Sequence, residues 1–533
     1  MSQVNQHNNK VAVIDVGGVG VTYAELHRRA RRLATRIHHF KEPTIACFQR
    51  ASSSYVVTMM ATWMAGKRFL PLCTTHPEAE LRYFVDDSNT GAIVYSSSED
   101  GGAGKFLANL GKPCVDSDSE LSVEPTSKAQ PPPPTPPCPS SDALILYTSG
   151  TTGRPKGAVH THHSLSSMVQ GLVVSWEYSS SDHILHFLPL HHLHGVLNKL
   201  CCVLHAGGCI EFLATAQPKV IWERLACPSS PKVTLFMAVP TIYARMIEYA
   251  SAQEVGGRTG GAATIKAALE AVRRDSRLMA CGSAALPDPV MDAWRQLTGQ
   301  VLLERYGMTE CGMILSNPYK PTSARLPGHV GSPLPQVEVR LVDDNEREIP
   351  HSRSSSAAAE EEAAGGERVG ELRVKGPTVF REYLNRREAF LDSFDTDGWF
   401  KTGDVAVRRP GSGVYAILGR SSTDIIKSKG FKLSALEIER ELLSADDVVN
   451  EAAVVGRPHP MDGEVVVAVV VPQKQYAHLS PAELKAHLQP FLKTKLASYK
   501  LPVRYHVAQA LPRNALGKVQ KKTLFKDLGI TEL

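Results

Sequence analysis

The sequence lacks several features that would define its class at once. No stretch approaches the roughly eighteen uninterrupted apolar residues that a membrane-spanning helix needs, so no membrane span is predicted. The ten cysteines are scattered without a Cys-x-x-Cys spacing, which favours reduced thiols in a reducing compartment over a disulfide or zinc framework. A net charge of +5, spread along the chain, does not indicate nucleic-acid binding. These absences leave an ordinary globular protein of an intracellular compartment.

The length of 533 residues exceeds what one hydrophobic core usually serves, so two or more domains are expected. Low-complexity runs at 131–137, 256–261 and 354–362 are predicted as a spacer and two loops that carry no chemistry. After Arg420 the pattern changes to a helix over 435–443 and apolar strands over 451–455 and 465–471. The predicted domains are therefore 1–420 and a small α+β unit over 421–533.

The N-terminus does not resemble a mitochondrial presequence, because its first twenty residues contain Lys10 as the only clear cation and also contain Asp15. An arginine-rich helix follows, opened by a capping box of Thr22 and Glu25. Alone it could be mistaken for a transit peptide. A predicted strand over 11–14 precedes it, which favours a structural helix.

The run over 147–157 has the composition of a phosphate-binding loop. Glycines let backbone N–H groups approach a polyphosphate, hydroxyls donate to its oxygens, and Lys156 adds a positive charge. An apolar strand over 143–146 precedes it, and strand ends are where α/β proteins bind nucleotides. A Walker loop is excluded, because Pro155 precedes the lysine and Gly157 follows it. A flexible surface linker is the disfavoured alternative. ATP is the predicted ligand.

Two further clusters lie far away in the chain, at 305–310 and at 399–404 with 419–420. Tyr306 offers a ring face for a purine, and Glu310 offers a carboxylate for Mg²⁺. Asp404 is a candidate acceptor for ribose hydroxyls, and Arg420 is a further donor. Each has an ordinary alternative: Tyr306 as half-buried core, Glu310 as a helix residue, Asp404 as a turn residue.

Together these motifs resemble the adenylate-forming superfamily of acyl-CoA synthetases, peptide-synthetase adenylation domains and firefly-type luciferases. The resemblance runs from about residue 10 to 522 in the family's order, with further signatures at 282–287, 419–432 and 512–518. It implies an α/β fold with a large N-terminal adenylate-forming domain of stacked α/β subdomains and a small mobile α+β C-terminal lid. The lid would pivot at Ser422, where many relatives have Asp or Lys.

The resemblance also implies the chemistry. A carboxylic acid would attack the α-phosphorus of ATP to give an acyl-adenylate, and the thiol of CoA would then displace AMP. Catalytic residues implied by the motifs are Lys156, His192, Thr309 and the adenylation lysine Lys518. Mg²⁺ would bind Glu310. The residues implied to bind ATP or CoA are Thr148, Ser149, Gly150, Thr151, Thr152, Gly153, Lys156, Tyr306, Thr309, Asp404, Arg420, Lys429 and Gly430, the last two lining a pantetheine channel.

The identity of the acid depends on Arg245. A buried unpaired guanidinium is costly, whereas a second carboxylate would pair with it, so Arg245 suggests a short dicarboxylic acid. The alternative is that Arg245 faces solvent on a helix. The segments 191–195, 239–245 and 282–287 further resemble malonyl-CoA synthetases, bacterial and mitochondrial. That resemblance implies that Arg245 and Ser283 hold the distal carboxylate and that Leu193 and Met308 bound the space at C2.

The sequence thus predicts an ATP-dependent ligase that forms malonyl-CoA, AMP and diphosphate from malonate, with methylmalonate left open. The main alternative is an acyl-CoA synthetase for a short or medium monocarboxylic acid, which predicts an exposed Arg245. A luciferase-like oxygenase is remote, and a degenerate scaffold is disfavoured because Lys518, Glu310 and Asp404 are all present. The expected partners are small molecules, and the oligomeric state stays open. Resemblance favours the mitochondrial matrix, with the cytosol as the alternative.

Overall fold

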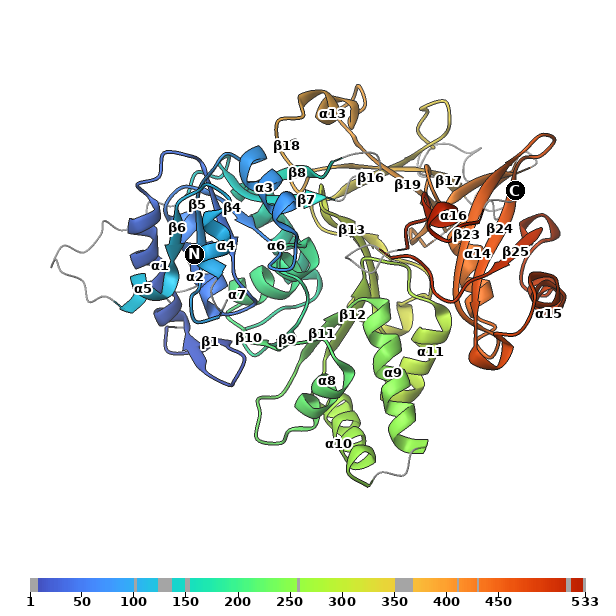
Figure 1. Cartoon of the computed structure of the whole chain (residues 1–533), viewed down its shortest axis with the longest axis horizontal. Coiled ribbons are helices and arrows are strands. Elements are labelled where there is room, and N and C mark those ends of the chain that lie inside the picture. Colours follow the sequence, from blue (N-terminus) through green and yellow to red (C-terminus); the bar gives the residue numbers. More distant parts are fainter. Residues whose placement is uncertain are drawn as a thin grey trace.

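The computed structural model describes residues 8–99, 103–122, 137–148, 154–255, 259–349, 368–409, 412–428, 431–513 and 519–530. These residues form a large N-terminal domain of three sheets and a small C-terminal domain around a fourth sheet (Figure 1). The predicted fold class is therefore confirmed. Within the described ranges, no helix is both long and apolar enough to cross a membrane.

The first sheet has seven strands in the order β18-β8-β7-β4-β3-β5-β6. Its central strands are parallel and almost fully buried, as expected when helices cover both faces. The strands are β3 (Thr44–Phe48), β4 (Arg68–Pro71), β5 (Thr90–Tyr95), β6 (Cys114–Asp116), β7 (Asp142–Thr148), β8 (Lys156–Thr161) and β18 (Glu382–Tyr383). Its connections contain α2 (Ser53–Met64), α3 (Glu78–Asp87), α4 (Ala103–Ala108) and α5 (Ser117–Ser122).

The second sheet has nine strands in the order β15-β14-β13-β12-β11-β9-β10-β1-β2. They are β1 (Val11–Ile14), β2 (Gly20–Thr22), β9 (His183–His186), β10 (Cys209–Phe212), β11 (Leu235–Ala238), β12 (Leu278–Gly282), β13 (Leu303–Met308), β14 (Gly312–Ser316) and β15 (Ser332–Pro333). Apolar side chains of this sheet and of the first sheet belong to one continuous core, to which α1 (Tyr23–Ile37), α2 and α6 (His162–Ser175) also contribute. The stacking of subdomains therefore rests on a shared core.

Helices α8 (Pro218–Ala226), α9 (Pro240–Val255), α10 (Thr259–Asp275) and α11 (Asp288–Thr298) enclose a second core with β9, β11 and β12 (Figure 1). A π-helical segment, η2 (His194–Cys201), continues into α7 (Cys202–His205), and a short 3₁₀ turn spans Thr322–Ala324. Helix α10 already begins at Thr259, so the loop predicted over 256–261 is wrong for its last three residues. A glycine pair is tolerated in the first turn of this helix because the helix packs against α8 and α9.

The third sheet is antiparallel and consists of β16 (Glu338–Val342), β17 (Arg368–Lys375), β19 (Phe400–Arg408) and β20 (Tyr415–Arg420). Helix α13 (Arg387–Asp392) lies between β18 and β19 in the chain. Strand β20 ends at Arg420, where the domain boundary was predicted from the sequence, and the boundary itself stays a prediction.

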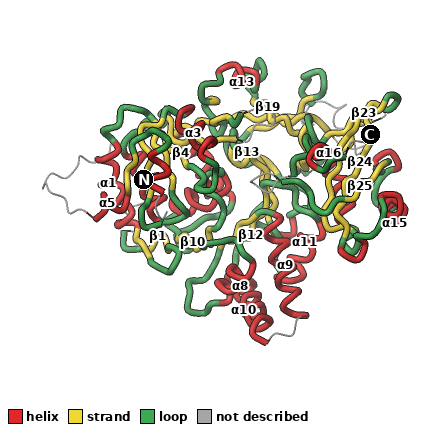
Figure 2. The backbone as a smooth tube through the Cα atoms, in the orientation of Figure 1, coloured by secondary structure: helices red, strands yellow, loops and turns green. Residues whose placement is uncertain are grey.

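The C-terminal domain has its own core. Its sheet contains β21 (Ile425–Ser428), β22 (Phe431–Ser434), β23 (Val449–His459), β24 (Gly463–Pro472) and β25 (Arg504–Val507). Helices α14 (Ala435–Leu443), α15 (Pro481–Lys493) and α16 (Leu524–Asp527), with 3₁₀ turns at Lys474–Tyr476 and Ser498–Lys500, complete it. Figure 2 shows α15 on the outer side of this sheet. The predicted helix over 435–443 and both predicted strands are confirmed.

Helix α14 brings a positive charge to the large domain. Arg440 Nε lies 3.9 Å from Asp288 Oδ1, beside the buried Glu304 on β13. Burial raises the pKa of the Glu304 carboxyl from 4.5 to about 8, although the N–H of Gly328 donates to Glu304 Oε1 at 2.9 Å and Arg440 opposes the rise. Glu304 is therefore largely protonated at neutral pH.

We expect Glu304→Gln to stabilise the protein at pH 8 and to change little at pH 4. Between pH 4.5 and about 8 the folded state keeps a proton that the unfolded state releases, so rising pH favours unfolding of the wild type. Glutamine keeps an oxygen for the N–H of Gly328 and carries no charge. Urea unfolding at both pH values should show a gain of roughly 2–4 kcal/mol at the higher one. Equal stability changes at both pH values would contradict the raised pKa.

Candidate active site

The predicted phosphate loop connects β7 and β8, which pair antiparallel, so it is the tip of a hairpin and not a strand-to-helix turn. Thr148 Oγ1 donates to the Lys156 carbonyl at 3.4 Å across its base. The Lys156 ammonium lies 5.0 Å from the centroid of the Tyr383 ring. Ser149, Gly150, Thr151, Thr152 and Gly153 lie outside the described residues. The base of the hairpin thus points Lys156 toward β18.

Helix α3 holds both sides of this hairpin. The Tyr83 hydroxyl donates to the Pro155 carbonyl at 2.7 Å, on the β8 side. On the β7 side, the Tyr147 hydroxyl donates to Asp87 Oδ2 at 2.8 Å, and the Tyr147 ring stacks on Phe84 with 4.3 Å between centroids. No local pattern in the sequence indicated that 83–87 would contact 147–155. A rigid helix therefore fixes both ends of the loop.

Glu310 lies in the turn between β13 and β14, so its alternative interpretation as a helix residue is wrong. Its carboxylate is 7% exposed, and Oε1 accepts the Tyr383 hydroxyl at 2.7 Å. Burial raises the pKa of this carboxyl, and the bond from Tyr383 opposes the rise. Tyr383 thus lies between Lys156 and Glu310 and brings the hairpin and the β13–β14 turn together. The sequence analysis did not find Tyr383.

Thr309 is held by a histidine that the sequence analysis also did not find. His160 Nε2 lies 2.7 Å from the Thr309 carbonyl oxygen, joining β8 to the same turn. Burial lowers the pKa of His160 to about 4, against the opposing effect of this hydrogen bond. A neutral imidazole at physiological pH can donate from Nε2, which is the role this geometry gives it. The turn that carries Thr309 and Glu310 is therefore fixed from the first sheet.

Asp404, Tyr306 and Arg420 meet as the sequence predicted, although they come from three strands. Asp404 and Arg420 face one another in the register of β19 and β20. Asp404 Oδ1 lies 3.3 Å from Arg420 Nε, and Oδ2 accepts the hydroxyl of Tyr306. The alternative interpretation of Tyr306 as a half-buried core residue is partly right, since its ring also packs against the main core. The arrangement places a half-buried aromatic ring beside a buried carboxylate.

A buried positive charge lies within β13. Arg305 is 3% exposed, and its Nη2 donates to Ser283 Oγ at 3.2 Å. Burial lowers its pKa to about 10. Among the described residues no carboxylate forms an ion pair with Arg305. A buried guanidinium without an acid partner costs several kcal/mol, so this feature indicates a site for an anionic ligand.

Two neighbours shape this position. Ser283 Oγ lies 3.4 Å from His194 Nδ1, at the start of η2, and Ser283 has a left-handed backbone with φ of 70°. Such a conformation is uncommon for a residue with a Cβ and often marks a functional site. A Cβ on Gly282 would lie 2.9 Å from Arg305 Cζ and 2.7 Å from its carbonyl oxygen. Glycine at 282 is therefore required for the guanidinium to lie where it does.

The other predicted acid-binding residues differ in their surroundings. Leu193 is buried and Met308 is partly buried, both in the main core. Arg245 is exposed on α9, and in the described part of the chain it has no ion pair. Exposure is what the monocarboxylate alternative predicted for it. The ring of His192 lies 4.2 Å from that of His191, centroid to centroid.

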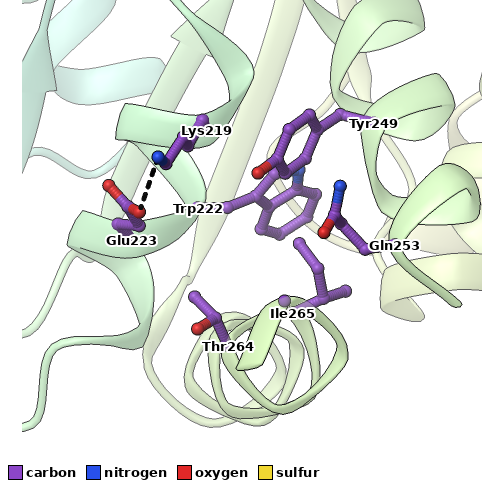
Figure 3. Close-up of a pocket in the computed structure, with 8 residues that line it drawn as sticks. Lys219, Trp222, Glu223, Tyr249, Gln253, Thr264 and Ile265 are labelled. Atoms are coloured by element: carbon purple, nitrogen blue, oxygen red, sulfur yellow. Dashed lines mark ion pairs between the residues drawn. The ribbon is translucent and has the colours of Figure 1, made fainter. Parts of the chain in front are cut away.

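Two hollows in the described part of the chain lie away from these motifs. One of about 350 Å³ lies between α8, α9 and α10, where Figure 3 shows Trp222, Tyr249 and Ile265 pointing toward one another. Another of about 440 Å³ runs from Glu248 on α9 to residues 446–450 and 472–475 of the C-terminal domain. Neither contains a predicted site residue, so the candidate site is defined by its polar contacts.

Lys429, Gly430 and Lys518 lie outside the described residues. The segments that flank Lys518 are anchored on both sides. Arg513 pairs with Val519 as an isolated bridge, and Arg513 also forms an ion pair with Glu451. Lys521 Nζ lies 2.6 Å from Asp424 Oδ1 and 2.7 Å from Glu439 Oε1. Asp424 also accepts the N–H of Arg420, so these contacts link the segment to the predicted hinge.

Comparison with known proteins gives consistent results. The family model described as AMP-binding enzyme matches residues 2–384, and that of the AMP-binding enzyme C-terminal domain matches 437–518. Mitochondrial malonate–CoA ligase ACSF3 of Mus musculus is 40% identical, covering 98% of this chain and 89% of that protein. Malonate–CoA ligase of Arabidopsis thaliana is 39% identical, covering 92% and 78%. ATP-bound MatB from Rhodopseudomonas palustris aligns with a TM-score of 0.81 and 31% identity over 99% of this chain and 98% of that one.

Proposed function

The chain belongs to the AMP-binding enzyme family, and from that premise we propose that it is an ATP-dependent acid–thiol ligase for malonate. It joins malonate to CoA and releases AMP and diphosphate. Relatives named malonate–CoA ligase at about 40% identity support this activity. A solved malonyl-CoA ligase complex with methylmalonyl-CoA and AMP, 32% identical, is a further neighbour.

The proposal that the substrate is a dicarboxylate rests on the buried Arg305. One carboxylate of malonate must reach the α-phosphorus of ATP, and the other must be held without reacting. A guanidinium that has no acid partner in the described chain, with Ser283 beside it, provides two kinds of donor for that second carboxylate. An acetate or octanoate would leave this charge buried and unpaired. Leu193 and Met308 would then bound the space at C2 of malonate.

Glu310 and the hairpin define where ATP would bind. The donor set fits Mg²⁺, because this ion prefers oxygen ligands and commonly takes one or two carboxylates together with substrate phosphates. Glu310 would hold the ion, which would neutralise charge on the phosphates. Lys156 would bind the phosphates from the hairpin, Tyr306 would stack on the adenine, and the Asp404 carboxylate would accept from the ribose.

Adenylation brings two anions together, so the residues around the α-phosphate must offset their repulsion. Lys156 and Lys518 would place positive charge there, with Thr309 and His192 positioning the reacting groups. Rotation of the C-terminal domain at Ser422 would then withdraw Lys518 and bring Lys429 and Gly430 toward a pantetheine channel. The CoA thiol would attack the acyl carbon, and AMP would leave with the bonding electrons.

The substrate assignment is tested by CoA-dependent AMP formation from ATP with acetate, malonate, methylmalonate, succinate and octanoate. We expect malonate to give the highest kcat/KM. In the malonate reaction the exposed Arg245 guanidinium would close on the distal carboxylate. Arg245→Ala should then lower kcat/KM for malonate by an amount equivalent to about 1.5–3 kcal/mol of transition-state stabilisation. Unchanged kinetics in Arg245→Glu would remove Arg245 from the site, and a lead by acetate or octanoate would favour the monocarboxylate alternative.

The vertebrate relatives are named as mitochondrial proteins, and we place this enzyme in the mitochondrial matrix on that similarity. Fractionation of cells that produce the protein with a C-terminal tag tests this location. Recovery of the tag with matrix markers supports it, and recovery in the cytosol contradicts it.

A further inference from the structure

A second cluster of reactive side chains borders the candidate site, and its residues have no role in the function proposed above. Ligand atoms of Cys73, His76 and His191 all lie within 4.8 Å of one another, and all three side chains are partly exposed. Cys73 follows β4, His76 precedes α3, and His191 lies between β9 and η2. The cluster therefore joins a connection of the first sheet to a connection of the second.

We propose that Cys73, His76 and His191 bind a Zn²⁺ ion. Thiolate and imidazole are the ligands that this ion prefers, with Zn–S of about 2.3 Å and Zn–N of about 2.0–2.1 Å. A tetrahedral ion with such bonds separates its ligand atoms by roughly 3.5 Å, so the three side chains need to close by about an ångström. Three protein ligands leave the fourth position open to water.

The surroundings favour an ion. His76 Nδ1 is buried, has no hydrogen-bond partner among the described residues, and lies 3.7 Å from Glu80 Oε1. A carboxylate behind a histidine is the usual support of a metal ligand, because it orients the ring and raises its basicity.

The position of the cluster would let a bound ion link two segments of the candidate site. His76 is just before α3, the helix that braces the phosphate hairpin, and the His191 ring contacts that of His192. Bound Zn²⁺ would tie the start of α3 to the segment that carries His192 and Leu193. The sequence analysis did not predict this site, because His191 becomes a neighbour of Cys73 and His76 only through the fold.

The test uses Co²⁺ as a spectroscopic substitute for Zn²⁺. The full chain, freed of metal with a chelator, should show a thiolate-to-cobalt charge-transfer band that saturates at one equivalent, and Zn²⁺ should displace it. Cys73→Ser should abolish the band. Loss of a residue that supports a metal ligand lowers metal affinity by about 10- to 100-fold, so His191→Gln, which removes a ligand itself, should weaken Co²⁺ binding by at least that factor. Glu80→Gln should weaken it by about tenfold.

Cys227→Ser is the matched control. Cys227 is a free, partly exposed thiol as Cys73 is, but it is not part of the Cys73 cluster. The cobalt band should persist in this variant. Zn²⁺ should also raise the melting temperature of the wild type and of Cys227→Ser, and not that of Cys73→Ser. A wild type without a thiolate band, a band that survives in Cys73→Ser, or a band that depends on Cys227 would overturn the proposal.

Discussion

Arg305→Met should remove most malonate-dependent AMP formation while leaving the fold intact or more stable. The loss expected for one partner of a buried charge pair is about 2–4 kcal/mol, roughly 30- to 1000-fold in kcat/KM. Methionine is an unbranched apolar side chain that occupies much of the space without a charge, so the free protein no longer keeps a guanidinium away from water. Kinetics with malonate and acetate, together with thermal unfolding, measure both effects. Preference for malonate over acetate should fall, because only malonate has a second carboxylate to pair.

Arg325→Met is a suitable control for this prediction. Arg325 is also buried, and burial also lowers its pKa to about 10, but its guanidinium donates to the carbonyl oxygens of Pro318, Val301 and Tyr319. Its replacement should destabilise the protein and leave the order of substrates unchanged. If Arg305→Met destabilised the protein as Arg325→Met does and kept the malonate preference, Arg305 would be a structural residue.

Lys518→Ala should separate the two half-reactions. We expect formation of malonyl-AMP to fall by about 10²–10³-fold, because a positive charge is lost where negative charge develops. Conversion of supplied malonyl-AMP to malonyl-CoA should survive, since the proposed rotation withdraws Lys518 before the thiol attacks. Diphosphate release reports the first step, and chromatography of malonyl-CoA reports the second.

Lys522→Ala tests whether any lysine of this basic segment would serve. Lys522 is exposed and lies four positions beyond Lys518, past the Arg513–Val519 pair. Both half-reactions should remain near the wild-type rates in this variant. Equal loss of both half-reactions in Lys518→Ala would contradict a mechanism that uses two positions of the C-terminal domain.

Much of the local structure followed from the sequence. The spacing of apolar residues along the sequence located the buried strand before the phosphate loop, helix α14 and strands β23 and β24. Each of these elements has a recognisable apolar pattern within its own residues. Composition failed at Thr259–Gly261, where packing of α10 against α8 and α9 outweighs the preference of glycine for loops. The ordinary alternative for Glu310, a helix residue, is also wrong, because Glu310 lies in a turn between two antiparallel strands.

The candidate site was predicted unevenly for a related reason. The sequence analysis named Tyr306, Asp404 and Arg420 because they lie in short motifs that can be recognised from consecutive residues. The structure brings the three side chains together. Tyr383 and His160 were missed, since each acts through a single long-range hydrogen bond. Arg305 belongs to a motif that the sequence analysis recognised, but nothing in the sequence indicated that its guanidinium would be buried without an acid partner among the described residues.

The sequence by itself determined the family, the nucleotide motifs and the order of the domains, because these depend on residue types and spacings along the chain. Only the tertiary structure decided which charges are buried and which are exposed. It buried Arg305 beside Ser283, left Arg245 on a helix surface, and placed Cys73 and His76 near His191 from a distant segment. The physical reason is that desolvation and pairing depend on distances in space, and the packing of the two large sheets sets those distances.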